Sequence, residues 1–322
     1  PRTGAPDLGA YEVQGNETVV VLATSDLHGH IYPIDYFTNK ADDGGLAQIY
    51  TYVKQVRIDN PNVLLVDNGD VLEGGNSVLP YHYMFDSSVT NPMIKVMNLM
   101  GYDSMSLGNH EFNYGLKTLG KAISEARFPV VSANIVRESG ESFIQPYTIK
   151  DFGQFKVGVL GITTPKVPTW EKPENIDGLV FMSPLETALK YVPDMRAQGA
   201  DVVIIVGHTG WERKPKDSGK PEAWGSPDNW VDTGQAEENW ALRLANNVPG
   251  LDAIVAGHDH SVTVAHSVGH WGTPTTPPRQ RPQPQLITPH PDRPRRPPPA
   301  PRQAGVGGGE WWWVVLAACG ES

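Results

Sequence analysis

The first 270 residues of the chain contain short blocks rich in apolar residues, most of them continuous apolar runs, separated by segments of mixed polarity. The blocks at 18–24, 63–66, 104–107, 128–132, 156–161, 202–206 and 253–256 predict seven strands. Uninterrupted apolar runs, as opposed to strict alternation, are typical of strands that are covered on both faces. Helical patterns lie between the strands. The sequence therefore predicts an α/β fold in one domain, without internal repeats.

Three of the intervening segments have clear helical features. Apolar residues recur at three- and four-residue intervals over 46–56. Pro92 suits the first position of a second helix, and Gly101 suits its end. Ser183 and Glu186 have the spacing of a capping box, followed by a further apolar stripe. We expect helices at all three places.

The composition of the chain changes abruptly near residue 273. Residues 274–301 hold 12 of the 29 prolines, and every lysine lies at or before Lys220. Proline fixes φ and lacks a donor, so this segment cannot form a helix or an interior strand. We divide the chain into an N-terminal extension (1–17), a folded domain (18–273) and a Pro/Arg/Gly-rich tail (274–322) that is disordered or non-native. The apolar run at 311–319 either docks on the domain or stays exposed.

Charge and cysteine content exclude several classes of protein. The chain has 26 basic and 36 acidic residues, a formal charge of −10. An acidic chain does not favour binding of a nucleic acid polymer or an anionic membrane. No apolar run is long enough to span a bilayer, and no signal peptide is recognisable. The single cysteine excludes an internal disulfide and a cysteine-based zinc cluster.

Polar clusters of one kind follow five of the predicted strands, and each combines carboxylate, amide or imidazole side chains. In chain order they are Asp26 and His28; Asp67 and Asp70; Asn109, His110 and Glu111; His208; and His258 and His260. In open α/β sheets, ligands bind outside the carboxyl ends of the strands. We therefore expect these side chains to lie close together.

Carboxylates and imidazoles without thiolates suit Zn²⁺, Mn²⁺ or Fe. Two such ions about 3.5–4 Å apart can clamp a phosphate and generate hydroxide near neutral pH. The glycines before Asp70, Asn109, His208 and His258 suit tight turns that bring the backbone close to the ions. Any one cluster alone would more often be ordinary loop or cap residues. The ordered set at five strand ends favours a metal site.

This ordered set, Asp-x-His, Gly-Asp, Gly-Asn-His-Glu, Gly-His and Gly-His-x-His, resembles the signature of the calcineurin-like metallophosphoesterases. Residues 108–116, 128–134 and 191–201 are further similar to the 5′-nucleotidase group, in particular its bacterial 2′,3′-cyclic-nucleotide 2′-phosphodiesterase/3′-nucleotidase branch. The resemblance covers about residues 18–274. It implies a metallophosphoesterase catalytic domain with a four-layer α/β/β/α sandwich. Family members usually continue into more strands and a nucleotide-binding domain, so we expect the sandwich to be incomplete at its C-terminal edge.

The resemblance also implies a role for each matching residue. One ion would be held by Asp26, His28, Asp70 and His260, and the second by Asp70, Asn109, His208 and His258. A hydroxide bridging the two ions would attack phosphorus in line. Asn109 and His110 would be catalytic, with His110 near the leaving oxygen, stabilising charge or donating a proton.

Three further residues are candidates for a supporting role. Asp67 and Glu111 either orient ligand histidines or only cap turns. Asn113 stands where 5′-nucleotidase members have an Asp that orients the catalytic histidine. An Asn cannot stabilise an imidazolium as a carboxylate can. The cyclic phosphodiesterase branch resembles this chain in having Asn there, so we interpret the change as a mark of the branch.

The expected function is hydrolysis of nucleotide phosphoesters with two divalent ions as cofactors, and a small nucleotide as substrate. A 5′-nucleotidase, a related sulfate-ester hydrolase and a truncated, non-catalytic metal-binding or adhesion protein are the alternatives. By resemblance the protein is expected in the periplasm, in the cell wall or outside the cell.

Overall fold

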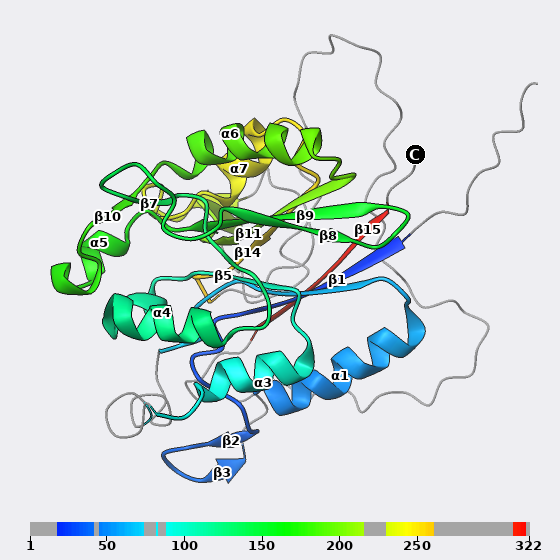
Figure 1. The fold of residues 1–322 in the computed structure, drawn as a ribbon, viewed down its shortest axis with the longest axis vertical. Helices are drawn as coiled ribbons and strands as arrows, with labels where there is room; N and C mark the ends of the chain where they lie inside the picture. Colours follow the sequence, from blue (N-terminus) through cyan, green and yellow to red (C-terminus); the bar gives the residue numbers. More distant parts are fainter. Residues whose placement is uncertain are drawn as a thin grey trace, which may run out of the picture.

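The computed structural model describes residues 18–41, 45–73, 82, 88–215, 230–260 and 312–319. Two main β-sheets stack face to face, and helices cover both outer faces (Figure 1). This is the four-layer α/β/β/α arrangement that the sequence predicted. Neither the extension at 1–17 nor the tail at 274–311 lies within the described residues, so the domain boundaries remain a prediction.

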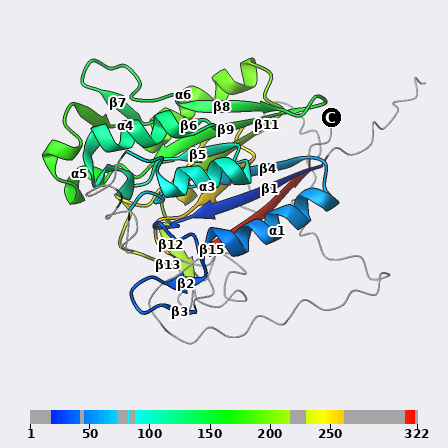
Figure 2. The ribbon, with the colours of Figure 1, turned by 60° about the horizontal axis from the view of Figure 1, so that its bottom comes forward.

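The first sheet has the strand order β15-β1-β4-β5-β6. The bounds are β1 Thr18–Ser25, β4 Val63–Asp67, β5 Ser104–Ser106, β6 Val130–Val131 and β15 Trp312–Cys319. The first four strands run parallel, and β15 pairs antiparallel with β1 (Figure 2). The apolar run at the end of the chain thus docks on the domain and covers one sheet edge, where unpaired backbone groups would otherwise be exposed.

The second sheet has the order β14-β11-β9-β8. The bounds are β8 Tyr147–Asp151, β9 Lys156–Thr163, β11 Val202–His208 and β14 Ala253–Ala256. Strands β9, β11 and β14 are parallel, and β8 is antiparallel to β9. All seven strands predicted from apolar runs are therefore present. The sequence analysis missed β8, whose residues are half-buried or exposed at the sheet edge.

Alternation along β1 shows how the layers are held together. Val19, Val21 and Ala23 pack between the two sheets, against residues of β9 and β11. Val20 and Leu22 point the other way, into the core beneath the helices. Successive side chains of a strand point to opposite faces. A strand between two apolar layers must therefore be apolar at every position, which explains the continuous runs.

Helices α1 (Leu46–Asp59), α3 (Pro92–Met100) and α4 (Gly115–Glu125) cover the first sheet, and α6 (Pro184–Ala197) and α7 (Ala241–Asn247) cover the second (Figures 1 and 2). The predicted end of α3 at Gly101 and the predicted cap of α6 at Ser183 are present, and α3 has a further cap, Asn91, that was not predicted. The Asn91 side chain accepts hydrogen bonds from the first turn of α3, Gly101 ends that helix with φ of 70°, and Ser183 caps α6.

Short elements complete the described part of the chain. The β-pairs are β2 (Ile34–Asp35) with β3 (Lys40–Ala41), β7 (Ile135–Arg137) with β10 (Leu179–Phe181), and β12 (Arg213–Pro215) with β13 (Trp230–Asp232). The short helices are η1 (His110–Phe112), α5 (Val167–Trp170) and η2 (Pro173–Asn175). No helix in the described segments has both the length and the apolar character needed to cross a bilayer.

Candidate dinuclear metal site

The five predicted clusters lie at the C-terminal ends of β1, β4, β5, β11 and β14, from both sheets. Backbone hydrogen bonds join the first two of these loops: Asp26 N–H donates to Gly69 O at 3.0 Å, and His28 N–H donates to Asp70 O at 2.8 Å. The sandwich therefore brings together side chains that are more than 200 residues apart in the sequence.

Backbone conformation sets these residues apart from the rest of the protein. Among described non-glycine residues, six have positive φ, and five of them are candidate ligands. These are Asp26 (54°), His28 (46°), Asp70 (57°), His258 (73°) and His260 (48°). Each such conformation costs of order 1–3 kcal/mol, and such residues gather at functional sites. The fold tolerates this strain where it directs the candidate ligands toward one another.

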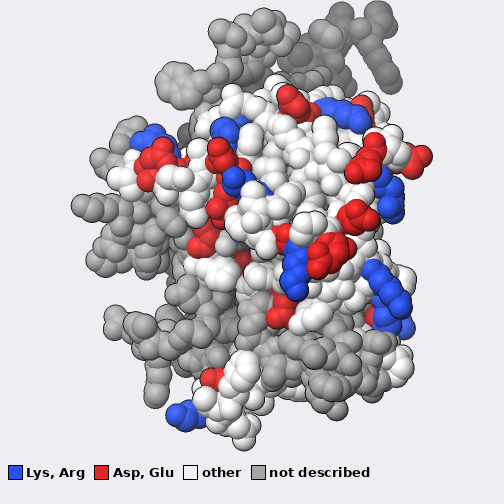
Figure 3. Space-filling model, turned by 90° about the vertical axis from the view of Figure 1, so that its left-hand side faces the viewer, with Lys and Arg blue, Asp and Glu red and all other residues white. Residues whose placement is uncertain are grey.

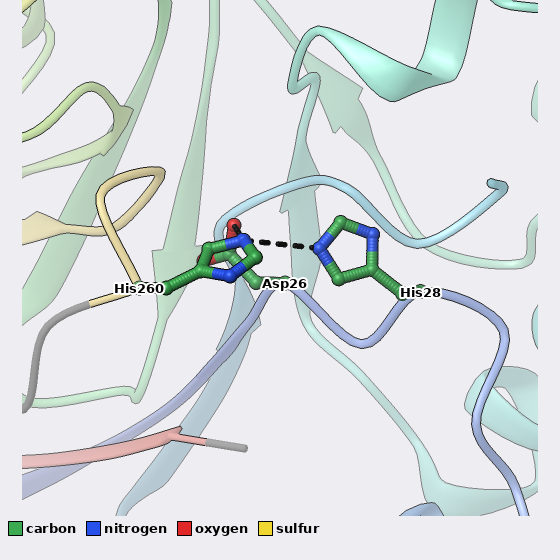
Figure 4. A group of neighbouring side chains, drawn as sticks. All are labelled: Asp26, His28 and His260. Carbon is green, nitrogen blue, oxygen red and sulfur yellow. Dashed lines mark hydrogen bonds and ion pairs between the residues drawn. The ribbon is translucent and has the colours of Figure 1, made fainter. Parts of the chain in front are cut away.

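The first ligand group consists of Asp26, His28 and His260, whose donor atoms all lie within 4.8 Å of one another. The Nε2 atoms of the two histidines are 3.2 Å apart, and His260 Nε2 lies 3.3 Å from Asp26 Oδ1. Figure 4 shows the three side chains converging from the loops that follow β1 and β14. Asp26 Oδ1 is buried and accepts no hydrogen bond from any described residue. A buried carboxylate oxygen without a donor, facing two imidazoles, fits a cation site.

The second ligand group consists of Asp70, His208 and His258, again with donor atoms within 4.8 Å. His208 Nε2 lies 3.1 Å from Asp70 Oδ2 and 3.2 Å from Asn109 Oδ1. Asp70 also belongs to a third set of mutually close donor atoms, with His28 and His110. Its carboxylate thus lies within reach of both ligand groups, as a bridging ligand must.

Hydrogen bonds at the rear of three rings determine which nitrogen faces the site. His28 Nδ1 lies 2.8 Å from the Glu73 carbonyl oxygen, and His208 Nδ1 lies 2.7 Å from the Asn68 carbonyl oxygen. A carbonyl only accepts, so both Nδ1 atoms carry hydrogen, and Nε2 is the nitrogen of each ring that faces the site.

His258 is held through its other ring nitrogen, Nε2. Its Nε2 lies 2.6 Å from Glu238 Oε1, which leaves Nδ1 for the site. The Glu238 backbone carbonyl accepts hydrogen bonds from Thr164 Oγ1 and Thr209 Oγ1, both at 3.0 Å. The carboxylate is therefore anchored close to its histidine. Glu238 was not predicted from the sequence, because it lies in a loop 20 residues before its partner.

The electrostatics favour positive charge between the two ligand groups. Burial raises the pKa of Asp26 and of Asp70, but His260 and His208 outweigh it, and both carboxyl pKa values lie below their usual range. Burial lowers the pKa of His208, but the carboxylates of Asp70 and Asp26 outweigh it and raise the pKa to about 10. Both carboxylates are thus ionised at neutral pH. Their charge, which stabilises an imidazolium here, would stabilise a divalent cation in the same place.

Glu111 supports the Asp70 loop through the backbone. It is buried, and its two carboxylate oxygens accept hydrogen bonds from four backbone N–H groups: Asp70 (2.8 Å), Val71 (2.7 Å), Leu72 (3.0 Å) and Gly108 (2.6 Å). Because Gly108 directly precedes Asn109, Glu111 joins the loops that carry the candidate ligands Asp70 and Asn109.

Asp67 also accepts hydrogen bonds from neighbouring residues, but from two donors and not four. Its Oδ1 accepts a hydrogen bond from Gly69 N–H at 2.8 Å, and its Oδ2 accepts one from Thr24 Oγ1. For Asp67 and Glu111 these contacts favour turn capping over a role in orienting a ligand histidine.

Two glycines permit the loops to approach one another. A Cβ atom at Gly108 would lie 2.3 Å from Asp70 Oδ1. A Cβ atom at Gly257 would lie 2.1 Å from Ser25 Oγ and 3.1 Å from Asp26 Oδ2. The shortest distance at each glycine is far inside van der Waals contact. A larger residue at either place would therefore displace a candidate ligand or the loop that carries it.

His110 lies beside both groups. Its backbone N–H donates to Asp70 Oδ1 at 2.8 Å, and its ring lies edge-on to the His28 ring at a centroid distance of 5.3 Å. Its Nδ1 lies 2.7 Å from Asn113 Oδ1. Asn113 thus contacts the histidine that the sequence analysis paired it with.

The rim of the site carries an exposed aromatic ring. The Trp170 ring packs on His258 at a centroid distance of 5.4 Å, and 48% of the residue is exposed. The face of the molecule in Figure 3 shows acidic and basic side chains interspersed, with no extended basic patch among its described residues.

Known proteins are similar to this chain over most of its length. A family model described as calcineurin-like phosphoesterase matches residues 19–262. The trifunctional nucleotide phosphoesterase protein YfkN of Bacillus subtilis is 37% identical over 258 residues, which are 75% of this chain and 16% of that protein. A 2′,3′-cyclic-nucleotide 2′-phosphodiesterase/3′-nucleotidase of Haemophilus influenzae is 34% identical over 254 residues, 74% of this chain and 36% of that protein. The chain thus spans about a third or less of the length of these curated relatives.

Solved structures of phosphoesterases are also similar to this chain. The crystal structure of calcineurin-like phosphoesterase YfkN from Bacillus subtilis superposes with a TM-score of 0.65 at 36% identity, covering 76% of this chain and 73% of that one. A putative 5′-nucleotidase from Staphylococcus aureus gives a TM-score of 0.67 at 29% identity, covering 78% and 47%. Together with the ligand geometry, these matches establish that the chain belongs to the calcineurin-like phosphoesterase family.

Proposed function

We propose that this chain is a dimetal-dependent phosphoesterase that hydrolyses nucleotide phosphoesters, of the 2′,3′-cyclic-nucleotide phosphodiesterase and 3′-nucleotidase type. The carrying observation is the position of Asp70, whose carboxylate lies within 4.8 Å of donor atoms of both ligand groups. Two relatives at 34–37% identity are named as nucleotide phosphoesterases, which supports the choice of substrate.

The proposed ligands follow the two groups. Asp26, His28, Asp70 and His260 would hold one ion, and Asp70, Asn109, His208 and His258 would hold the other. Divalent ions bound there would neutralise phosphate charge and activate water, and Mn²⁺, Zn²⁺ and Fe all suit these ligands. Asp70 and Asn109 both contact His208, so they would hold the second group together.

In this proposal His110 acts on the leaving group. Its Nδ1 is engaged by Asn113, so Nε2 is the ring nitrogen available to the substrate. A protonated Nε2 would donate to the ribose oxygen as the P–O bond breaks, which typically contributes about 10²–10⁴-fold to the rate.

The relatives support a location outside the cytoplasm, in the periplasm, in the cell wall or secreted. One relative, 28% identical over 257 residues, is named snake venom 5′-nucleotidase, from Gloydius brevicauda. Recovery of the native protein only in a cytosolic fraction would contradict this part of the proposal.

The test compares 2′,3′-cyclic AMP, 3′-AMP and 5′-AMP as substrates, with Mn²⁺ and with EDTA. We expect EDTA-sensitive release of phosphate or nucleoside, faster from the first two, and its loss in Asp70→Asn and His110→Ala. Metal content is measured on the same samples by elemental analysis. A folded, metal-loaded sample that hydrolyses none of the three would contradict the proposal and favour a non-catalytic metal-binding protein.

A further inference from the structure

A chain of hydrogen bonds behind His110 ends at a carboxylate from a distant part of the sequence. His110 Nδ1 lies 2.7 Å from Asn113 Oδ1, and Asn113 Nδ2 donates to Glu171 Oε2 at 2.7 Å. Glu171 directly follows α5, 58 residues after Asn113. The Glu171 carboxylate therefore reaches His110 only through Asn113, whose neutral amide lies between them.

The surroundings hold Glu171 in place. Its other oxygen, Oε1, accepts hydrogen bonds from Asn175 Nδ2 at 2.9 Å and from Lys172 N–H at 2.7 Å. Asn175 Nδ2 also donates to the Asn113 backbone carbonyl at 2.9 Å. One oxygen of the carboxylate is therefore occupied by the η2 segment, and the other is directed at the Asn113 amide.

This arrangement determines the orientation of the Asn113 amide. An amide can present either its oxygen or its NH₂ group to a neighbour, whereas an ionised carboxylate only accepts. Facing Glu171, Asn113 must present Nδ2, so Oδ1 faces His110. An amide oxygen also only accepts, so His110 Nδ1 must carry a hydrogen. The His110 tautomer, with Nε2 directed to the site, thus depends on Glu171 through Asn113.

We propose that Glu171 is a positioning residue of the phosphoesterase reaction, which fixes the orientation of the Asn113 amide and thereby directs His110 Nε2 toward the leaving oxygen. The inference rests on the proposed function. It assigns to this chain a three-membered relay in which a carboxylate acts through an amide instead of contacting the histidine.

The relay acts in the step where the leaving group departs. The P–O bond to the ribose breaks with its electron pair on the ribose oxygen, while a new P–O bond forms to the oxygen of water. The proton on His110 Nε2 passes to the ribose oxygen, and His110 becomes neutral with its Nδ1–H still donating to Asn113. A proton from the attacking water is released to solvent, and His110 is reprotonated from solvent. No oxidant or other co-reactant is needed.

The first test is Glu171→Gln in the full chain. A glutamine can accept from Asn113 Nδ2 or donate to its Oδ1, so it no longer selects one amide orientation. We expect kcat for 3′-AMP to fall about 10- to 100-fold, part of the usual contribution of a general acid, with KM and metal content unchanged. For 4-nitrophenyl phosphate, whose leaving group needs no proton, we expect kcat to change less than about 3-fold. Glu174→Gln, an exposed neighbour in η2, is the matched control and should behave as wild type.

A double variant separates positioning from general damage. Asn113→Asp alone sets two carboxylates against each other at the 2.7 Å contact and should be impaired. Combined with Glu171→Gln, it gives a carboxylate that accepts from both His110 and the glutamine, and we expect it to recover most of the 3′-AMP activity lost in Glu171→Gln.

The outcomes distinguish the inference from the proposed function. If the wild-type protein hydrolyses neither substrate with metal bound, the proposed function fails first. If the wild type is active but Glu171→Gln loses metal, loses both substrates equally or stays fully active, the positioning role of Glu171 is refuted. Absence of any recovery in the double variant would also overturn it.

Discussion

Replacing Glu111 by Gln tests whether the loops that carry the ligands are held by one buried carboxylate. Glu111 Oε1 accepts from Val71 and Leu72 N–H, and Oε2 accepts from Asp70 and Gly108 N–H. A glutamine has one acceptor oxygen, so in either orientation its NH₂ group faces two backbone donors. The substitution is nearly isosteric, and the expected effect therefore comes from hydrogen bonding and charge, not from volume.

The expected magnitude follows from those two lost partners. A buried donor left without an acceptor costs about 1–3 kcal/mol, which gives roughly 2–6 kcal/mol for two. Burial raises the pKa of Glu111, and the neighbouring Asp70 charge raises it further. Replacing the carboxylate relieves some of that cost, so we expect a loss of roughly 2–4 kcal/mol in unfolding free energy. At about 2–4 °C per kcal/mol for domains of 150–250 residues, Tm should fall by about 5–15 °C.

The assay is urea and thermal unfolding of wild type and Glu111→Gln in EDTA, so that the signal reports on folding without bound metal. Glu174→Gln serves as an exposed carboxylate control. A loss below about 0.5 kcal/mol, the usual size of a surface change, would show that the four contacts do not hold the loops and would refute the reasoning. Metal titration of the same variant should also show weaker binding, because Asp70 loses the backbone anchor of its loop.

Three further substitutions test other parts of the site and fold. Glu238→Gln removes the charged partner of His258 and should weaken metal binding by about 10- to 100-fold in a competition titration, with unchanged Tm in EDTA; unaltered affinity would contradict the contact. Gly257→Ala should lower both metal content and activity, since its methyl group would meet the loop that carries Asp26; full metal loading would argue against the close approach. Burial raises the pKa of Glu125, but Lys121 lowers it more, so its folded-state pKa lies below the ordinary 4.5. Its stabilisation is therefore present above about pH 4.5 and is lost as the pH falls through the folded-state pKa. The difference in urea stability between wild type and Glu125→Gln, roughly 1 kcal/mol at pH 7, should shrink steadily as the pH is lowered below 4.5, and a constant difference would exclude this linkage.

Most of the fold could be predicted because its signals are local. A strand between two apolar layers must be largely apolar on both faces, so the seven predicted strands were visible as blocks rich in apolar residues. Helix ends were visible where the end favours a particular residue, as at Pro92, Gly101 and Ser183. Strand β8 was not visible, because its residues are half-buried or exposed and do not form a continuous apolar run.

The site was predictable for a related reason. Parallel strands place their carboxyl ends at one edge, so residues such as Asp26, Asp70 and His208 could be grouped before their distances were known. Their roles also rest on the family resemblance, and assignment of each ligand to one ion remains a prediction.

The sequence by itself determined the α/β class, the two-sided burial of the strands and the candidate ligands, because each follows from spacing along the chain or from the position of a residue at a strand end. Only the tertiary structure decided what stands behind those ligands. Glu171 reaches Asn113 across 58 residues and Glu238 reaches His258 across 20. Neither hydrophobic periodicity nor a helix cap links the two residues of such a pair in the sequence. Their contact follows from how separate loops come to lie over the sandwich, which depends on the packing of all four layers.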